Sequence, residues 1–180
     1  MATDHVDAGV VIDGRLFEGA RGLAGAAGWL ALNPVERDDY RRLGCLEAEI
    51  AAPGIVRRMV WRIKSGDRSR VLDAAGGDLA GITAPLIFAA AADGDGVAVS
   101  VVRDTARYIG MAVANLVAML DPEVVVLGGL MATAVDQLIE PCRSEAVRRV
   151  PHAADVRIVP AALGAHAAAI GAARAAMHPH

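Results

Sequence analysis

Glu47 is the carboxylate whose position in the sequence most suggests a binding role. It follows Gly44-Cys45-Leu46 at the start of a helical pattern that runs to about residue 52. An ionised carboxylate offers only hydrogen-bond acceptors, so Glu47 can hold the hydroxyls of a sugar-like ligand. An acidic residue in a first helical turn also stabilises the helix dipole without any ligand. The residue types alone leave both interpretations open.

Gly128 and Gly129 form the second candidate site. They follow a continuous apolar run, 124–127, which is typical of a strand buried on both faces, and a helical pattern follows over about 132–149. Open α/β sheets bind ligands beyond the carboxyl ends of their strands, where glycines let a nucleotide approach the backbone. The same Gly-Gly turn is also common as a plain connection.

Other chemistry-bearing groups are less specific. The glycine-rich segment 19–28 is interpreted as a flexible loop rather than the lining of a ligand site. Asp4, His5 and Asp7 form either a casual metal site or, as we favour, a solvated chain start. None of the histidines stands at metal-binding spacing with a cysteine, and no Ser/His/Asp order or acidic pair stands out. The residues alone therefore indicate no catalytic group.

Composition limits the possible classes of protein. The 180 residues are 54% hydrophobic and 22% charged, which indicates one folded domain or one lobe of a larger protein. A net charge of −3 opposes nucleic-acid binding by this segment.

Two cysteines exclude a disulfide framework and a four-cysteine zinc site, and suit a reducing compartment. The polar start lacks the pattern of a secretory leader, and the longest apolar helical stretch, 108–120, is too short for a bilayer. We expect a cytoplasmic protein without a membrane partner.

The first third of the chain predicts a β-hairpin and two helices. A β-branched run over 6–12 reaches Asp13-Gly14, whose residue types favour a tight hairpin turn, and 15–18 is the expected return strand. A third short strand is expected over 29–32. Helices are expected over about 44–52 and, after Pro53 and Gly54, over 55–63.

The remainder alternates between helix and strand. Thr83 is expected to cap a helix that runs to about residue 92, and 94–120 holds the longest helical pattern. A strand at 156–159 and a helix at 164–177 complete an α/β order. We expect one unit over 1–180: a hairpin and glycine loop at 1–34, helices with two core strands at 35–177, and a tail at 178–180.

Taken together, these segments resemble the second, C-terminal lobe of the ROK family (repressor, ORF, kinase). Residues 8–20 resemble the family's opening hairpin, and Gly44-Cys45-Leu46-Glu47 is similar to its Gly-Cys-Leu-Glu segment. Further similar segments follow in family order: 22–25, 120–129, 162–164 and 169–173. The combination is far more specific than any one motif.

The resemblance implies an actin-like ATPase fold of two lobes, each with a ribonuclease-H-like sheet. Family members are sugar kinases that use ATP and magnesium, or sugar-responsive repressors. The implied roles are sugar binding for Glu47 and nucleotide binding for Gly9, Gly128 and Gly129. Trp29 departs from the family pattern, and its residue type suits either stacking on a sugar ring or half-buried packing. The first lobe, which carries the catalytic aspartate, has no counterpart in this sequence, so the resemblance assigns no catalytic residue here.

Departures from the family pattern affect three sites. Residues 3–9 replace the glycines of the second phosphate loop by side chains, except at Gly9, and Asp4 and Asp7 would repel a triphosphate. Residues 26–29 replace the family's Glu-x-Gly-His and so lose a sugar-binding carboxylate and a histidine. The family's cysteine cluster is reduced to Cys45, with residues 37–43 in place of the zinc loop, so we expect no zinc.

Three hypotheses about function follow from the resemblance. The first is the second lobe of a glucokinase-like sugar kinase, inactive as this chain alone, with ATP and magnesium used only by the intact parent. The second is the sugar-sensing part of a ROK transcriptional regulator, or a non-catalytic relative. The third is a half-domain that associates with its own copy, as a homo-oligomer, or with a separate first lobe. In each, the expected partners are a sugar ligand and another lobe or copy.

Overall fold

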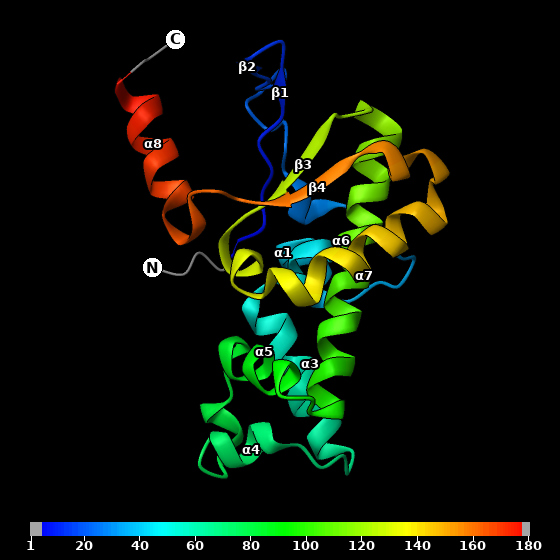
Figure 1. Ribbon diagram of the computed structural model, residues 1–180, viewed down its shortest axis with the longest axis vertical. Helices are drawn as coiled ribbons and strands as arrows, with labels where there is room; N and C mark the ends of the chain where they lie inside the picture. Colours follow the sequence, from blue (N-terminus) through cyan, green and yellow to red (C-terminus); the bar gives the residue numbers. More distant parts are fainter. Residues whose placement is uncertain (1–4, 178–180) are drawn as a thin grey trace.

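The computed structural model describes residues 5–177, and its helices are arranged around one long central helix, α6 (Gly96–Leu120). Helices α2, α3, α5 and α7 all pack against α6 (Figure 1). The other helices and strands have the following bounds: β1 Val11–Ile12, β2 Arg15–Leu16, α1 Asp38–Leu43, α2 Cys45–Ile50, α3 Ala52–Lys64, α4 Arg70–Ala74, α5 Ala84–Ala92, β3 Val124–Leu127, α7 Val135–Arg149, β4 Arg157–Pro160 and α8 Ala167–Met177. Short 3₁₀ helices occupy 27–29, 79–81, 129–134, 151–155 and 164–166. The antiparallel start followed by alternating helices and strands agrees with the expected α/β order.

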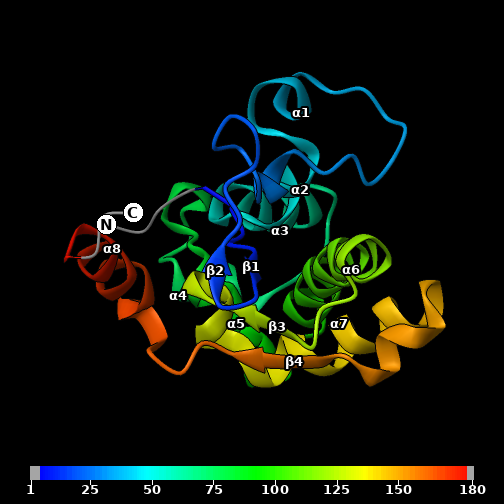
Figure 2. The ribbon, with the colours of Figure 1, turned by 90° about the horizontal axis from the view of Figure 1, so that it is seen from above.

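The opening hairpin is confirmed, although its strands are short. β1 and β2 pair antiparallel, with Val11 opposite Leu16. Asp13 and Gly14 both have positive φ, at 52° and 76°, as the tight turn between two strands requires. The hairpin and α8 both project from the helical body (Figures 1 and 2), and their residues are largely exposed.

The expected third strand over 29–32 is wrong. Residues Ala27–Trp29 form a 3₁₀ helix, in which the N–H groups of Trp29 and Leu30 donate to the carbonyls of Ala26 and Ala27. These local bonds use the donors that a strand would offer to a neighbour, and the chain therefore turns here instead of extending.

β3 and β4 form a parallel pair in which Val125 lies opposite Ile158. Both strands were predicted, but burial of β3 on both faces is wrong. Val125 and Leu127 pack against the core, whereas Val126 is 55% exposed. This alternation shows that the helices cover only one face of the pair.

Helix α3 begins earlier than expected, at Ala52. Pro53 stands in its first turn, where an amide hydrogen has no intrahelical acceptor, so proline is tolerated. Gly54 lies so close to α2 that an added Cβ would be 2.2 Å from the carbonyl oxygen of Ala48. A side chain at this position would force α2 and α3 apart.

The N-terminus of α6 is capped by a buried carboxylate. Asp95 accepts hydrogen bonds from the backbone N–H of Ala98 at 2.9 Å and of Arg70 at 2.8 Å, and from the Ser69 hydroxyl at 3.0 Å. Thr83 stands at the N-cap of α5 as expected, but its side chain makes no capping hydrogen bond. The Asp95 cap thus joins α4 to α6.

Within residues 5–177, no single helix is long and apolar enough to cross a membrane. In the part of the chain that the structure describes, the pair α5 and α6 meets that length and composition when taken together, but the two helices are bent by 113° at the break between them.

Candidate functional site

Glu47 lies on α2 and is held by the N-terminal segment of the chain. Its Oε2 accepts a hydrogen bond from the backbone N–H of Val6 at 2.8 Å, and its Oε1 lies 3.2 Å from Nδ1 of His5. The side chain is 8% exposed. Each carboxylate oxygen can accept more than one hydrogen bond, so these contacts orient Glu47 without exhausting its acceptors.

Gly28 brings the segment that carries Trp29 against Glu47. A Cβ at Gly28 would lie 2.7 Å from the carbonyl oxygen of Val6 and 3.2 Å from Oε2 of Glu47. Only glycine fits this approach without displacing one of them. Trp29 follows directly and is 59% exposed, so its ring is available for stacking. Glu47 and Trp29 therefore come from neighbouring segments.

The three glycines expected at a nucleotide lie in two different places. A Cβ at Gly9 would be 3.9 Å from a methyl group of Leu16, in the hairpin, whereas one at Gly128 would be 3.8 Å from Cβ of Ala161, after β4. Gly129 has φ 61° and open space around its Cβ position. The Gly128-Gly129 turn leaves its backbone accessible at the carboxyl end of β3, as a nucleotide site in this class of fold needs.

The cysteines are buried, and no metal ligands accompany them in the described part of the chain. The side-chain amide of Asn33 donates to Sγ of Cys45 at 3.7 Å, and burial raises the pKa of the Cys142 thiol to about 12. Among residues 5–177, no group of three or more His, Cys, Asp or Glu side chains is placed to hold a metal ion. Asp4, part of the casual metal site considered above, lies outside the described residues.

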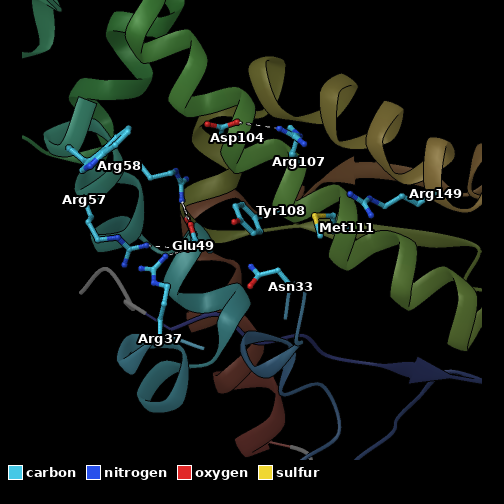
Figure 3. Close-up of a pocket in the computed structure, with 11 residues that line it drawn as sticks. Asn33, Arg37, Glu49, Arg57, Arg58, Asp104, Arg107, Tyr108, Met111 and Arg149 are labelled. Carbon is cyan, nitrogen blue, oxygen red and sulfur yellow. Dashed lines mark hydrogen bonds and ion pairs between the residues drawn. The ribbon is translucent and has the colours of Figure 1, made fainter. Parts of the chain in front are cut away.

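A pocket of ≈ 600 Å³ between α2, α3, α6 and the end of α7 was not expected from the sequence. We call it the arginine pocket. Figure 3 shows guanidinium groups on several sides of it and Glu49 among them. Its lining consists of Asn33, Arg37, Glu49, Arg57, Arg58, Trp61, Asp104, Arg107, Tyr108, Met111 and Arg149.

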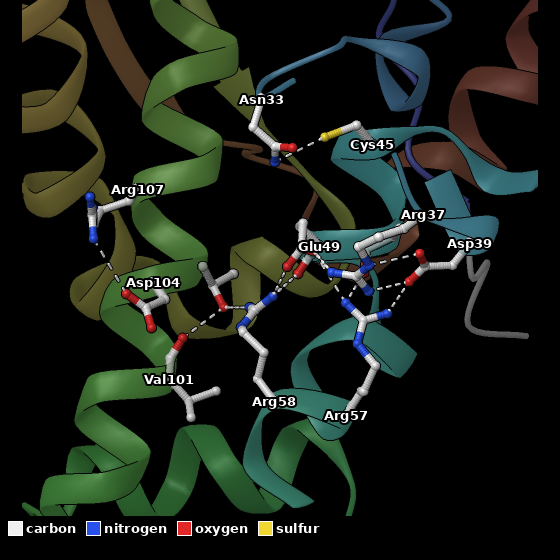
Figure 4. Close-up of polar contacts among 12 residues, drawn as sticks. Asn33, Arg37, Asp39, Cys45, Glu49, Arg57, Arg58, Val101, Asp104 and Arg107 are labelled. Atoms are coloured by element: carbon white, nitrogen blue, oxygen red, sulfur yellow. Dashed lines mark hydrogen bonds and ion pairs between the residues drawn. The ribbon is translucent and has the colours of Figure 1, made fainter. Parts of the chain in front are cut away.

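Glu49 is the centre of a polar network at one end of this pocket (Figure 4). Its carboxylate accepts hydrogen bonds from Arg37 at 2.9 Å, Arg57 at 3.2 Å and Arg58 at 2.7 Å. The hydroxyl of Tyr40 donates to it at 2.6 Å. The Glu49 side chain is 4% exposed, so these partners replace the water that it gives up.

The charged groups of this network are partly removed from water, and this shifts the pKa values of Tyr40, Arg58 and Asp39. Burial raises the pKa of Tyr40, and so does its hydrogen bond to Glu49. Burial lowers the pKa of Arg58, and the charge of Glu49 offsets only part of this effect. For Asp39, burial by itself raises the pKa, but the Arg37 hydrogen bond and the Arg57 charge outweigh it, so the pKa is lowered.

Sequence reasoning missed this network because its members are scattered from residue 33 to residue 149. Their spacing matches no local motif, and single arginines are usually solvated. One signal was present in the sequence: Glu49 stands in a mostly apolar run, Cys45–Ile50, and the structure buries every residue of this helix. A second acidic residue on such a helix requires cationic partners from elsewhere in the chain.

Comparison with known proteins relates the chain to one family. The model of the ROK family matches residues 6–178. A glucokinase of Halalkalibacterium halodurans is 35% identical over 173 residues, which cover 92% of this chain and 51% of the relative. The DNA-binding transcriptional dual regulator NagC of Escherichia coli is 31% identical over 135 residues, which cover 74% of this chain and 32% of the regulator.

Among solved structures, a ROK family glucokinase from Streptomyces griseus, in complex with glucose and AMPPNP, superposes with a TM-score of 0.77 at 26% identity. The match covers 92% of this chain and 55% of that one. The chain thus spans about half the length of the glucokinases it matches.

Proposed function

Because this chain belongs to the ROK family and has an actin-like ATPase fold, we propose that it is the second lobe of a glucokinase-like sugar kinase. The intact parent transfers a phosphoryl group from ATP to a sugar hydroxyl, and this chain by itself does not. The proposal places the activity in the cytoplasm, where ATP is available.

The observation that carries the proposal is the arrangement around Glu47. Its carboxylate is oriented by the backbone N–H of Val6 at 2.8 Å, and the chain passes so close at Gly28 that a Cβ there would lie 3.2 Å from Oε2 of Glu47, with the exposed Trp29 as the next residue. An oriented acceptor with a neighbouring exposed aromatic ring is a common way to hold a sugar, because one binds hydroxyls and the other covers an apolar ring face. Glu47 would fix the sugar, and Trp29 would limit its position.

The Gly128-Gly129 turn fits the adenosine side of ATP. Nothing lies within 4 Å of the Cβ position of Gly129, so a flat ligand can approach this backbone. Magnesium supplies charge neutralisation in phosphoryl transfer, but this chain's described residues offer no cluster to hold it. Phosphoryl transfer also needs a base and a metal site, which the proposal assigns to the first lobe as the partner of this one.

The direct test is the purified chain with ATP, magnesium and glucose in an assay of ADP release. We expect no turnover above a blank without protein. Turnover that survives further purification would contradict the claim that this lobe is inactive alone.

A chimaera tests the kinase assignment itself. In the H. halodurans glucokinase, the matching half is replaced by this chain, and glucose phosphorylation is measured. We expect ATP-dependent turnover, with KM for glucose raised at least about tenfold by Glu47→Gln, since a charge-assisted hydrogen bond contributes about 1.5–3 kcal/mol. The exposed Glu36→Gln change is the control and should leave KM unchanged.

The second candidate function is the sugar-sensing part of a ROK transcriptional regulator. The similarity to NagC supports it, and so does the exposed Trp29 where kinases of the family are expected to have histidine. This function predicts a chimaera that is folded by circular dichroism and binds glucose in calorimetry without turnover. A folded chimaera with turnover would reject it.

A further inference from the structure

We propose that the arginine pocket binds a phosphate group, separately from the sugar and nucleotide sites proposed above. Five of its lining residues are arginines, against two carboxylates, Glu49 and Asp104. A guanidinium presents its N–H groups in a planar fork that matches two oxygens of a phosphate. The excess of cations in one concave place favours an anionic ligand.

The paired carboxylates leave part of this positive charge unbalanced. Glu49 pairs with Arg37, Arg57 and Arg58, and Asp39 is a second carboxylate for Arg37 and Arg57, so two carboxylates face these three guanidiniums among residues 5–177. On α7, Arg149 shares the carboxylate of Glu145 with Arg148. Arg107 has a distant partner, Asp104, at 3.7 Å. These guanidiniums retain donors that a ligand can use.

The guanidinium of Arg58 has only part of its hydrogen-bonding capacity satisfied within the described residues. Its terminal nitrogens donate to Glu49 Oε2 at 2.7 Å and to the Thr105 hydroxyl at 2.6 Å. Its Nε is nevertheless the one buried side-chain nitrogen or oxygen without a hydrogen-bond partner in the part of the chain that the structure describes. A nearby anion would stabilise this dehydrated cation through its charge.

The size and the apolar part of the lining leave room for an organic group attached to the phosphate. A volume of ≈ 600 Å³ falls within the range of small-molecule sites. Tyr108, Met111 and Trp61 add aromatic and aliphatic surface beside the arginines. The shared chemistry is a phosphate group, whose source is either a small phosphate monoester or inorganic phosphate.

The pocket is distinct from the proposed sugar site because α2 separates them. Glu47 and Glu49 are two residues apart on this helix, about 200° around its axis. Glu47 contacts Val6 and His5, whereas Glu49 contacts the arginines. A ligand in the pocket therefore contacts the side of α2 away from Glu47.

The test is calorimetric titration of the chain with inorganic phosphate and, separately, with phenyl phosphate, at ionic strength held constant with chloride. The double change Arg107→Gln/Arg149→Gln removes two pocket cations and leaves Glu145 its partner Arg148, so the fold should persist. The matched control, Arg103→Gln/Arg148→Gln, removes the same charge from the same two helices outside the pocket lining.

We expect saturable binding that the pocket variant weakens at least about tenfold and the control leaves within about twofold. Tighter binding of phenyl phosphate would identify a monoester as the ligand class, and equal binding would identify phosphate itself. Heat no greater than that of chloride, or equal losses in the two double variants, would overturn the proposal. Circular dichroism melting confirms that each variant is folded.

Discussion

Glu47 and Glu49 stand two residues apart on α2, yet their carboxylates have entirely different partners. Glu47 accepts from the Val6 backbone at 2.8 Å, whereas Glu49 is surrounded by three guanidiniums, the nearest being Arg58 at 2.7 Å. Successive residues on an α-helix are separated by about 100°, so a spacing of two directs side chains to nearly opposite faces. One short helix therefore serves two separate polar regions.

Replacing Glu49 should destabilise the protein strongly. Glu49→Gln leaves Arg58 without its charged partner in a site where that side chain is 16% exposed. Breaking one partner of a buried ion pair costs about 3 kcal/mol, and we expect a loss of that size in urea unfolding. The control, Glu36→Gln, removes an ion pair with Arg41 in which both side chains are mostly exposed, and should cost less than about 0.5 kcal/mol. Equal losses in the two variants would contradict the assigned role of Glu49.

Helices α6 and α7 cross at Gly110 with no room for a methyl group. A Cβ there would lie 2.6 Å from the carbonyl oxygen of Cys142 and 2.7 Å from Cβ of Glu145. Gly110→Ala should therefore lower the free energy of unfolding by about 2 kcal/mol, the usual cost of overpacking. Gly171→Ala, inside α8 with no atom within 4 Å of the new methyl, should cause no loss. Unchanged stability of Gly110→Ala would show that the two helices can separate at little cost.

The Asp95 cap makes the stability of the folded protein depend on pH in the acidic range. Burial by itself raises the pKa of Asp95, but hydrogen bonds from Ala98, Arg70 and Ser69 outweigh it, so the folded-state pKa is lowered. Its contribution is complete above the unfolded-state pKa of about 3.9 and disappears as pH falls through the lower folded-state value. Thermal melts from pH 6 to pH 2 should show this loss in the wild type.

Asp95→Asn should reduce that acid dependence, because an amide does not titrate. The exposed Asp93→Asn change, two residues earlier, should keep the wild-type pH profile. If Asp95→Asn and wild type lose stability in parallel below pH 4, the cap is not the source of the effect.

The Cys142 thiol should be inert in the folded protein. It is fully buried, and burial raises its pKa to about 12, so almost no thiolate is present at pH 8. In a Cys45→Ser variant, a chromogenic disulfide reagent should react with Cys142 only as fast as the protein unfolds. In guanidinium chloride the same thiol should react within seconds. Rapid reaction without denaturant would contradict the packing around α7.

Zinc should be absent from the purified chain in stoichiometric amount. The prediction rests on the reduced cysteine pattern of the sequence, in which Cys45 is the remaining member of the family's cluster. Elemental analysis after purification without chelator is the measurement. One zinc per chain would mean that ligands other than a cysteine cluster hold the metal.

The sequence predicted local structure well where the signal is local. Positive φ at Asp13 and Gly14 followed from their residue types, and the long helix α6 followed from apolar residues at steps of three and four. Strand β3 was also recognised from its apolar run. Its burial on both faces was not observed, since the number of covered faces depends on which elements pack against a strand.

The motifs of the family were likewise readable in the sequence, because they are short runs with a fixed order. They located Glu47, Gly128 and Gly129 and led to the ROK family, which the comparisons confirm. The roles of these residues are proposals, because a sequence motif does not identify the groups that face it in the folded protein.

The arginine pocket was decided by tertiary structure alone. Arg37, Arg58 and Arg149 have no periodic relation in the sequence, and only the packing of α2, α3, α6 and α7 brings them together. Helical periodicity and turn chemistry act over a few residues, and they determine elements. The ion-pair partners of a buried charge can come from distant parts of the sequence, so they are identified only when the packing of the helices is known.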